Sequence, residues 1–264
     1  MTTPCYINPL FYFDPDNPYP ESDGRPMADN TLQFEWIVKI KENLEVLFAD
    51  RPDVFVAGDL LWYPAPDRQL ASPLAPDVMV VFGRPKGYRG CYKQWEEDNL
   101  PPQVVSEVLS PSNSRDEMRN KRDLYEQYGV EEYYVYDPDS PRLEVWLRQA
   151  GRLVPISHIK GWTSPRLGVR FELRGGSLNL YYPDGTPFRN AVELTRLARG
   201  EAERAEQEAK RAEQEAKRAE QEAQRAEQEA MRAAQEAARA DQEAAKAARL
   251  AARLRELGID PDVV

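Results

Sequence analysis

The most informative stretch of the chain is residues 104–138, which read VVSEVLSPSNSRDEMRNKRDLYEQYGVEEYYVYDP. Apolar runs near its two ends predict two strands. Between them, Ser114-x-x-Glu117 is a capping-box signature that opens a helix, and Gly129 supplies the stop. A strand, a crossover helix and a second strand predict an α/β domain built on a mixed sheet.

Two charged residues of this stretch occupy positions where the pattern predicts buried apolar side chains. Glu107 shares a strand face with Val105 and Leu109. Lys121 shares a helical stripe with apolar and aromatic residues, namely Met118, Leu124, Tyr125 and Tyr128. Burying either charge costs several kcal/mol unless the group is paired or holds a metal ion. The pattern therefore predicts a metal site or a structural ion pair.

A third candidate, Asp77, follows Pro76 and opens another predicted strand. About 30 residues separate it from Glu107, which is room for a loop that brings the two strands side by side, about 4.8 Å apart. Two carboxylates at that spacing can reach one Mg²⁺ ion, with water, a backbone carbonyl and phosphate completing its shell. Lys121 could then stabilise negative charge on phosphate or orient the attacking water.

Simpler roles for these residues stay open on the sequence. Asp77 could cap its strand, Lys121 could extend its ammonium to solvent with only its stem buried, and Glu107 could be satisfied by Lys121 alone. Asp59 is expected to be exposed, with a role as an extra metal ligand as the less favoured alternative. Two basic groups, with Tyr88, Tyr92 and Trp95, predict either a phosphate-binding surface or ordinary solvated segments. They are Arg84, Lys86, Arg89 and Lys93, and Arg115, Arg119 and Arg122.

Composition divides the 264 residues into three parts. Residues 1–30 predict an irregular arm, and residues 31–190 have the varied composition of a globular domain. A helix is expected at 31–48, with its buried face formed by Phe34, Ile37, Ile40, Leu44 and Leu47. Strands are expected at 54–63, 77–82, 103–109, 133–137, 143–147, 153–156, 169–173 and 178–182.

The third part, residues 191–264, contains a seven-residue repeat, RAEQEAK, with alanines spaced alternately three and four apart. This spacing predicts a helix from about 191 to 257, ended by Gly258, with Ala at the a and d positions of a heptad. An alanine seam buries little area, so a coiled-coil homodimer is favoured only modestly over a lone charged helix.

Bulk composition excludes several function classes. A single histidine, His158, rules out zinc sites built on several histidines and histidine-dependent triads. Two distant cysteines, Cys5 and Cys91, form no disulfide framework, which favours a reducing compartment. The chain lacks an apolar run of about 20 residues and a leader pattern, so a cytoplasmic location without membrane contact is expected. The net charge of −10 disfavours sequence-independent DNA binding but suits a site that holds a cation.

The motifs PDVMVV, VVSEVLSPSNS and K-x-x-x-Y-x-x-x-GVEEYYVYDP resemble the Uma-type restriction endonuclease family of the PD-(D/E)XK nuclease superfamily. The resemblance covers roughly residues 30–180. It implies a restriction-endonuclease-like mixed β-sheet core flanked by helices. It also implies phosphodiester hydrolysis in nucleic acid, DNA above all, with Mg²⁺ or Mn²⁺ held by Asp77 and Glu107.

The chain departs from the superfamily pattern in one place that matters for chemistry. The lysine normally lies two residues after the glutamate, where this chain has Leu109. The Uma-type family is thought to displace the lysine onto the next helix, and Lys121 matches that position. Family members often carry a histidine near the start of the first helix, where Gln33 stands here. The competing hypothesis is a catalytically silent nuclease fold that acts through its coiled-coil tail as an oligomerisation or partner-binding protein.

Overall fold

The computed structural model describes residues 18–24, 26–67, 72–256 and 258. The chain divides into two compact units, residues 1–191 and 192–264. Most of the predicted irregular arm lies outside the described residues, as does Cys5. Among the described helices, none combines the length and the apolarity that crossing a membrane requires.

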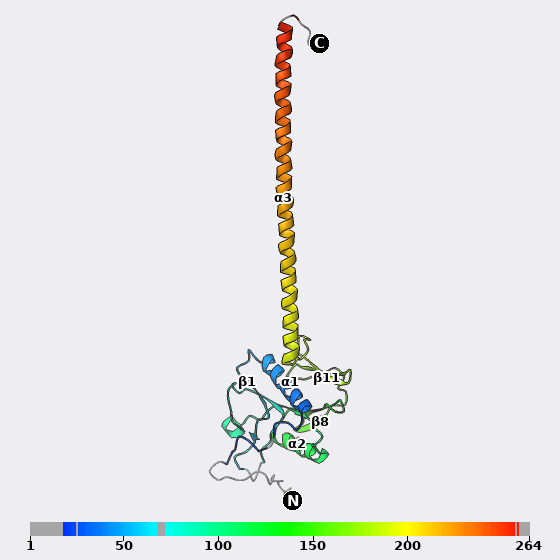
Figure 1. Ribbon diagram of the computed structural model, residues 1–264. Coiled ribbons are helices and arrows are strands. Elements are labelled where there is room, and N and C mark those ends of the chain that lie inside the picture. Colours follow the sequence, from blue (N-terminus) through cyan, green and yellow to red (C-terminus); the bar gives the residue numbers. More distant parts are fainter. Residues whose placement is uncertain (1–17, 25, 68–71, 257, 259–264) are drawn as a thin grey trace. The chain divides into compact units, whose positions relative to one another are not determined.

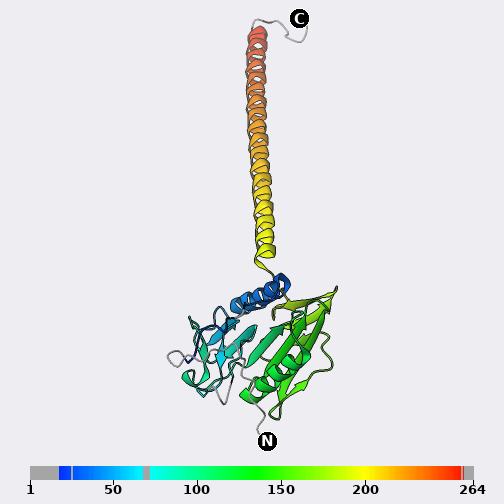
Figure 2. The same cartoon turned by 60° about the horizontal axis from the view of Figure 1, so that its bottom comes forward.

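A six-stranded mixed sheet forms the centre of the first unit (Figure 2), with the strand order β1-β3-β5-β6-β7-β8. Its strands are β1 (Val54–Gly58), β3 (Val78–Phe82), β5 (Val104–Val108), β6 (Glu132–Asp137), β7 (Arg142–Gln149) and β8 (Arg152–Pro155). β5 and β6 are parallel, and every other neighbouring pair is antiparallel. The predicted mixed α/β fold is confirmed.

Two helices cover opposite faces of this sheet. α1 (Thr31–Leu47) packs on the face formed by Val78, Val80 and Val104. α2 (Arg115–Tyr128) is the crossover between β5 and β6 and packs on the other face, against Val105 and Tyr133. The alternation of buried residues along each strand therefore sends one set of side chains toward each helix.

The local signals around α2 are present as predicted. The Ser114 hydroxyl accepts a hydrogen bond from the Glu117 N–H at 3.1 Å and caps the helix start. Gly129 ends the helix in the left-handed conformation, with φ of 99°, which glycine adopts without steric cost. These caps fix the length of α2 and hence the side chains that it presents to the sheet.

Smaller elements complete the first unit. An antiparallel sheet of β11 (Ser177–Tyr181), β10 (Arg170–Arg174) and β9 (Trp162–Thr163) contributes Phe171 and Leu180 to the core under α1. The ring of Phe171 stacks on Tyr134 of β6 at 4.6 Å. A parallel pair, β2 (Trp62–Tyr63) and β4 (Tyr92–Lys93), and a 3₁₀ helix, Gln94–Glu96, precede β5.

Two sequence predictions about this unit are wrong. The strand expected at 54–63 breaks after Gly58, because Asp59 takes a left-handed backbone with φ of 48° and its N–H donates to the Asp77 carbonyl at 3.2 Å. On α1, Phe34 is 47% exposed, and Gln33 is buried instead. Gln33 can be buried because its amide donates to the Val108 carbonyl at 2.9 Å.

One continuous helix of 66 residues, α3 (Ala191–Glu256), begins at the last residue of the first unit and forms most of the second (Figure 1). Within this fully described helix no residue is buried. The ion pairs Lys210–Glu206 and Lys217–Glu213, both at 2.6 Å, have the i,i+4 spacing that supports helices. The long helix is as predicted, whereas its pairing with a second copy stays a prediction.

Candidate active site

Glu107 lies at the centre of the candidate site, and its side chain is 3% exposed. Lys121 Nζ is 2.9 Å from Glu107 Oε2, and the Tyr125 hydroxyl donates to Glu107 Oε1 at 2.5 Å. Both donors lie on α2 one helical turn apart, so they reach the strand from the same helical face. The structure therefore brings Lys121 and Glu107 together.

Asp77 comes immediately before β3 and is 8% exposed. β3 pairs with β5 in an antiparallel register that places Val78 opposite Ser106, so Asp77 lies beside Glu107. The Val108 N–H donates to Asp77 Oδ2 at 2.6 Å. This bond fixes one end of the Asp77 carboxyl to the backbone of the residue that follows Glu107.

The electrostatics follow from two buried carboxyl groups that face one ammonium. Burial raises the pKa of the Asp77 carboxyl to about 8, and the Glu107 charge adds to the rise. Desolvation lowers the pKa of Lys121, but attraction to Glu107 and Asp77 outweighs it, so the net shift is upward. Near neutral pH the site therefore combines an ammonium at Lys121 with a protonated Asp77.

Asp59 is a fourth member of the site that sequence reasoning placed at the exposed surface. It is partly buried, and burial raises the pKa of its carboxyl to about 6, with a further contribution from repulsion by Asp23. The register that pairs Gly58 with Val78 sets Asp59 beside Asp77. The sequence did contain a signal for this position. An aspartate follows one strand and another precedes the next, so antiparallel pairing of the two strands brings the aspartates together.

A comparison with known families places this geometry in context. The model of the Uma2 family, described as "Putative restriction endonuclease", matches residues 26–180, which is more than half of the chain. The chain belongs to the Uma2 family. The membership inferred from the sequence motifs is confirmed, and the matched residues include Asp77, Glu107 and Lys121.

Other comparisons add little to the Uma2 match. The chain is similar to a solved structure described as a putative nuclease belonging to DUF820 from Anabaena variabilis, at 13% sequence identity and a TM-score of 0.40. That similarity covers 53% of this chain and 74% of the other. None of the curated proteins compared with the chain matches it.

The donor set of this Uma2 member suits one type of metal site. Within the described part of the chain there is no cluster of three or more Asp, Glu, His or Cys residues that could hold a metal. Mg²⁺ does not need such a cluster, because it keeps several waters and uses one or two carboxylates with substrate phosphate. Asp77 and Glu107 each have lone pairs beyond the bonds described, so this pair fits Mg²⁺.

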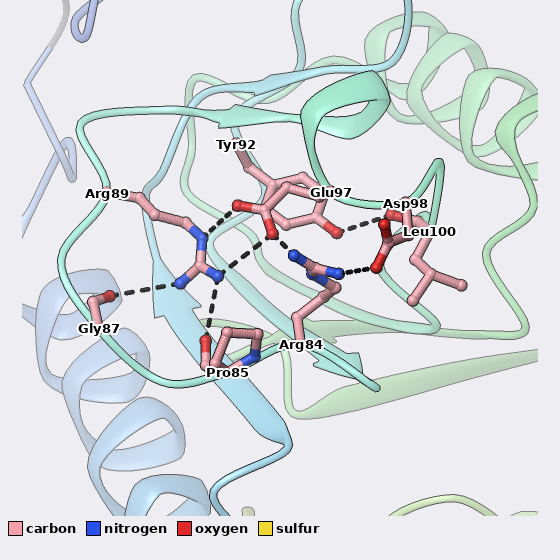
Figure 3. Close-up of polar contacts among 8 residues, drawn as sticks. All are labelled: Arg84, Pro85, Gly87, Arg89, Tyr92, Glu97, Asp98 and Leu100. Atoms are coloured by element: carbon pink, nitrogen blue, oxygen red, sulfur yellow. Dashed lines mark hydrogen bonds and ion pairs between the residues drawn. The ribbon is translucent and has the colours of Figure 1, made fainter.

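Arg84, Arg89 and Tyr92 of the Uma2 domain do not face a phosphate-binding surface, which is one of the two alternatives that the sequence leaves open. Figure 3 shows Arg84 and Arg89 directed at Glu97, with Nε–carboxylate distances of 2.7 and 2.6 Å. The Tyr92 hydroxyl donates to the Leu100 carbonyl at 2.7 Å. Because all three charged side chains are at most 17% exposed, this group is an internal cluster that shapes the loop.

Proposed function

We propose that this protein hydrolyses phosphodiester bonds in nucleic acid, with DNA as the first substrate to test, using Mg²⁺ or Mn²⁺ held by Asp77 and Glu107. One observation supports the proposal above all others. Asp77, a second buried carboxyl whose pKa is about 8, lies beside a Glu107 already paired with Lys121 at 2.9 Å. A structural ion pair needs no such neighbour, and clustered groups with shifted pKa values are typical of functional sites.

A divalent cation bound here would supply positive charge against the phosphate and would lower the pKa of water. Lys121 would contribute a second positive charge. Because its pKa is raised, Lys121 stays an ammonium at neutral pH. It therefore stabilises negative charge that develops on the phosphate, and does not remove a proton from water in this state.

The other contacts hold these groups in place. The Tyr125 hydroxyl fixes one oxygen of Glu107 at 2.5 Å, and its pKa lies well above the ordinary value because of burial and then the Glu107 charge. Tyr125 therefore remains a donor. The Val108 N–H holds Asp77 Oδ2, so both carboxyl groups are oriented before substrate arrives.

A second candidate function is favoured by a different observation. Both Glu107 oxygens already accept hydrogen bonds from α2, and the 66-residue helix α3 has no buried residue. The domain could thus be a silent scaffold and α3 the working part, as an oligomerisation or partner-binding helix. Such a scaffold would bind no metal, because Lys121 already neutralises Glu107.

A cleavage assay tests the first candidate. Supercoiled plasmid, linear duplex and single-stranded DNA are incubated with the full chain in Mg²⁺, in Mn²⁺ and in EDTA. Glu107→Gln and Lys121→Met are expected to lower cleavage about 100-fold or more, while Lys160→Met at an exposed lysine leaves it unchanged. Cleavage by the site variants at the wild-type rate, or no cleavage by folded wild type on any substrate, would reject the proposal.

A further inference from the structure

A groove lies between α2 and strands β6 and β7, next to the candidate site. Arginines contribute to its lining from both walls, namely Arg115, Arg119, Arg122 and Arg142. Apolar and aromatic side chains line it as well, namely Met118, Tyr133, Val135 and Trp146. Its cavity volume is about 240 Å³, just below the roughly 300–1,000 Å³ of small-ligand sites, and its mouth is open to solvent.

One polar atom in this groove lacks the partner that its burial requires. Tyr133 is 1% exposed, and within the described residues its hydroxyl is the one buried side-chain polar atom without a hydrogen-bond partner. The next residue, Tyr134, by contrast donates to Glu132 at 2.7 Å. A buried hydroxyl left unpaired costs about 1–3 kcal/mol. A polar atom of a ligand in the groove would remove that cost.

Two of the groove arginines, Arg119 and Arg142, are held loosely compared with those of the Glu97 cluster, whereas Arg122 pairs with Asp123 and lies over the Trp146 ring. Arg119 pairs with Asp116 at 3.2 Å and Arg142 pairs with Glu144 at 3.3 Å, and both arginine side chains are 61% exposed. Exposed pairs contribute only about 0–1 kcal/mol, so a phosphate can displace them. The first turn of α2 adds little to anion binding, because the carboxylates of Asp116 and Glu117 oppose the helix dipole there.

The groove lies close to the candidate site. Val135, which lines it, lies opposite Glu107 in the parallel β5–β6 pair. The Tyr133 ring packs against Tyr125 at 5.1 Å, and Tyr125 donates to Glu107. Adjacent strands are about 4.8 Å apart, so the groove begins one strand away from the proposed metal ligands.

We propose that this groove binds a nucleotide of single-stranded nucleic acid adjacent to the bond that is cleaved, an inference that rests on the proposed function for its substrate class. The phosphate is bound by Arg115, Arg119 and Arg142. The base lies against Trp146 in place of the Arg122 guanidinium, which covers that ring at 4.7 Å. The side chains that bury the Tyr133 hydroxyl move aside, so that this hydroxyl hydrogen-bonds the base edge. A cationic rim over aromatic side chains is how proteins bind single strands without strong sequence preference.

Fluorescence anisotropy with a labelled single-stranded oligonucleotide in EDTA tests the groove without any cleavage. The double variant Arg119→Ala/Arg142→Ala is expected to bind about tenfold more weakly, with a shallower salt dependence. Arg51→Ala/Arg174→Ala removes the same charge at exposed positions outside the groove and controls for the overall field. Tyr133→Phe is expected to weaken binding about three- to tenfold without lowering the melting temperature.

Equal losses in the two arginine double variants would overturn the assignment, as would wild-type binding by Tyr133→Phe or failure of wild type to bind. Glu107→Gln separates this inference from the proposed hydrolysis, because it should bind the oligonucleotide like wild type while losing cleavage. Binding through the groove without any cleavage would support the inference and reject the hydrolysis. If the groove variants cleave at the wild-type rate, that result would support the hydrolysis and reject the groove inference.

Discussion

Glu107, Asp77 and Lys121 form a site in which one ammonium faces two buried carboxyl groups. Lys121 neutralises Glu107 at 2.9 Å, which leaves Asp77 as a buried carboxyl whose pKa of about 8 reflects burial first and Glu107 second. A divalent cation would allow both carboxyl groups to ionise, because its charge would offset theirs. The same contacts therefore predict how stability and metal binding respond to substitution and to pH.

Lys121→Met should destabilise the metal-free protein by about 2–3 kcal/mol. Removing the ammonium leaves Glu107 buried without its cation. The destabilisation is smaller than the roughly 3–5 kcal/mol for breaking a fully buried pair, because Lys121 is 22% exposed. Urea unfolding measures it. Adding Glu107→Gln to Lys121→Met should recover part of the loss. A double variant that loses the sum of the two single effects would contradict the pairing.

The raised pKa of the Asp77 carboxyl should make the free energy of unfolding fall as pH rises. This carboxyl ionises near pH 3.9 in the unfolded chain and near pH 8 in the folded one, so the folded state binds the extra proton between those values. Asp77→Asn should flatten the dependence of unfolding free energy on pH in that window and exceed wild-type stability at pH 8. Identical pH profiles for the two proteins, measured by urea unfolding from pH 5 to 8, would show that Asp77 is not buried in this way.

The bounds of helices could be predicted well from local signals. Contacts between side chains that lie far apart in the sequence could not. Ser114 and Gly129 bounded α2 correctly because each acts on its own backbone. Asp59 was misjudged because its burial depends on pairing with the Asp77 strand, and Gln33 because its partner, Val108, lies 75 residues away. Glu107 and Lys121 could be identified because a charge within an apolar pattern is visible in the sequence itself.

The loop between β3 and β5 depends on Glu97, which binds both Arg84 and Arg89. Desolvation opposes ionisation of Glu97, but the two arginines outweigh it and hold its pKa below the ordinary value. Glu97→Gln should therefore cost about 1–3 kcal/mol at pH 7. That difference should shrink as pH falls through the folded pKa of Glu97, because a lowered carboxyl pKa stabilises only above it.

The control for Glu97 is Glu96→Gln, at a neighbouring carboxylate that is 58% exposed and pairs with Lys93 at 3.4 Å. It should change the unfolding free energy by less than about 0.5 kcal/mol. Thermal and urea unfolding at pH 7 measure both variants. Equal effects at the two positions would mean that the Glu97 cluster does not hold the loop.

The chain consists of two units that are stabilised by different interactions. The first buries a core on both faces of a sheet, whereas α3 is a single helix whose heptad alanines offer close packing but little apolar area. The helix itself could be read from the repeat, because alanine spacing and i,i+4 charge pairs act locally. The partner of the helix could not be predicted, because the heptad pattern does not specify what packs against the alanine seam.

Sedimentation of the full chain over a wide concentration range should show a monomer–dimer equilibrium. Ala219→Glu/Ala226→Glu places two charges on the alanine seam and should leave only monomer, because the charges would be buried on pairing. Gln221→Glu/Gln228→Glu adds the same charge off the seam and should sediment like wild type. Wild type that stays monomeric at every concentration would reject the coiled-coil dimer.

Titration of Mn²⁺ into the metal-free protein at pH 8, followed by calorimetry, distinguishes a metal site from a structural ion pair. The proposed site predicts one Mn²⁺ bound per chain, a higher melting temperature with the ion present, and loss of both effects in Asp77→Asn and Glu107→Gln. Glu96→Gln should bind like wild type. Absence of Mn²⁺ binding by folded wild type, or binding by either site variant as tight as that of wild type, would contradict a metal held by Asp77 and Glu107.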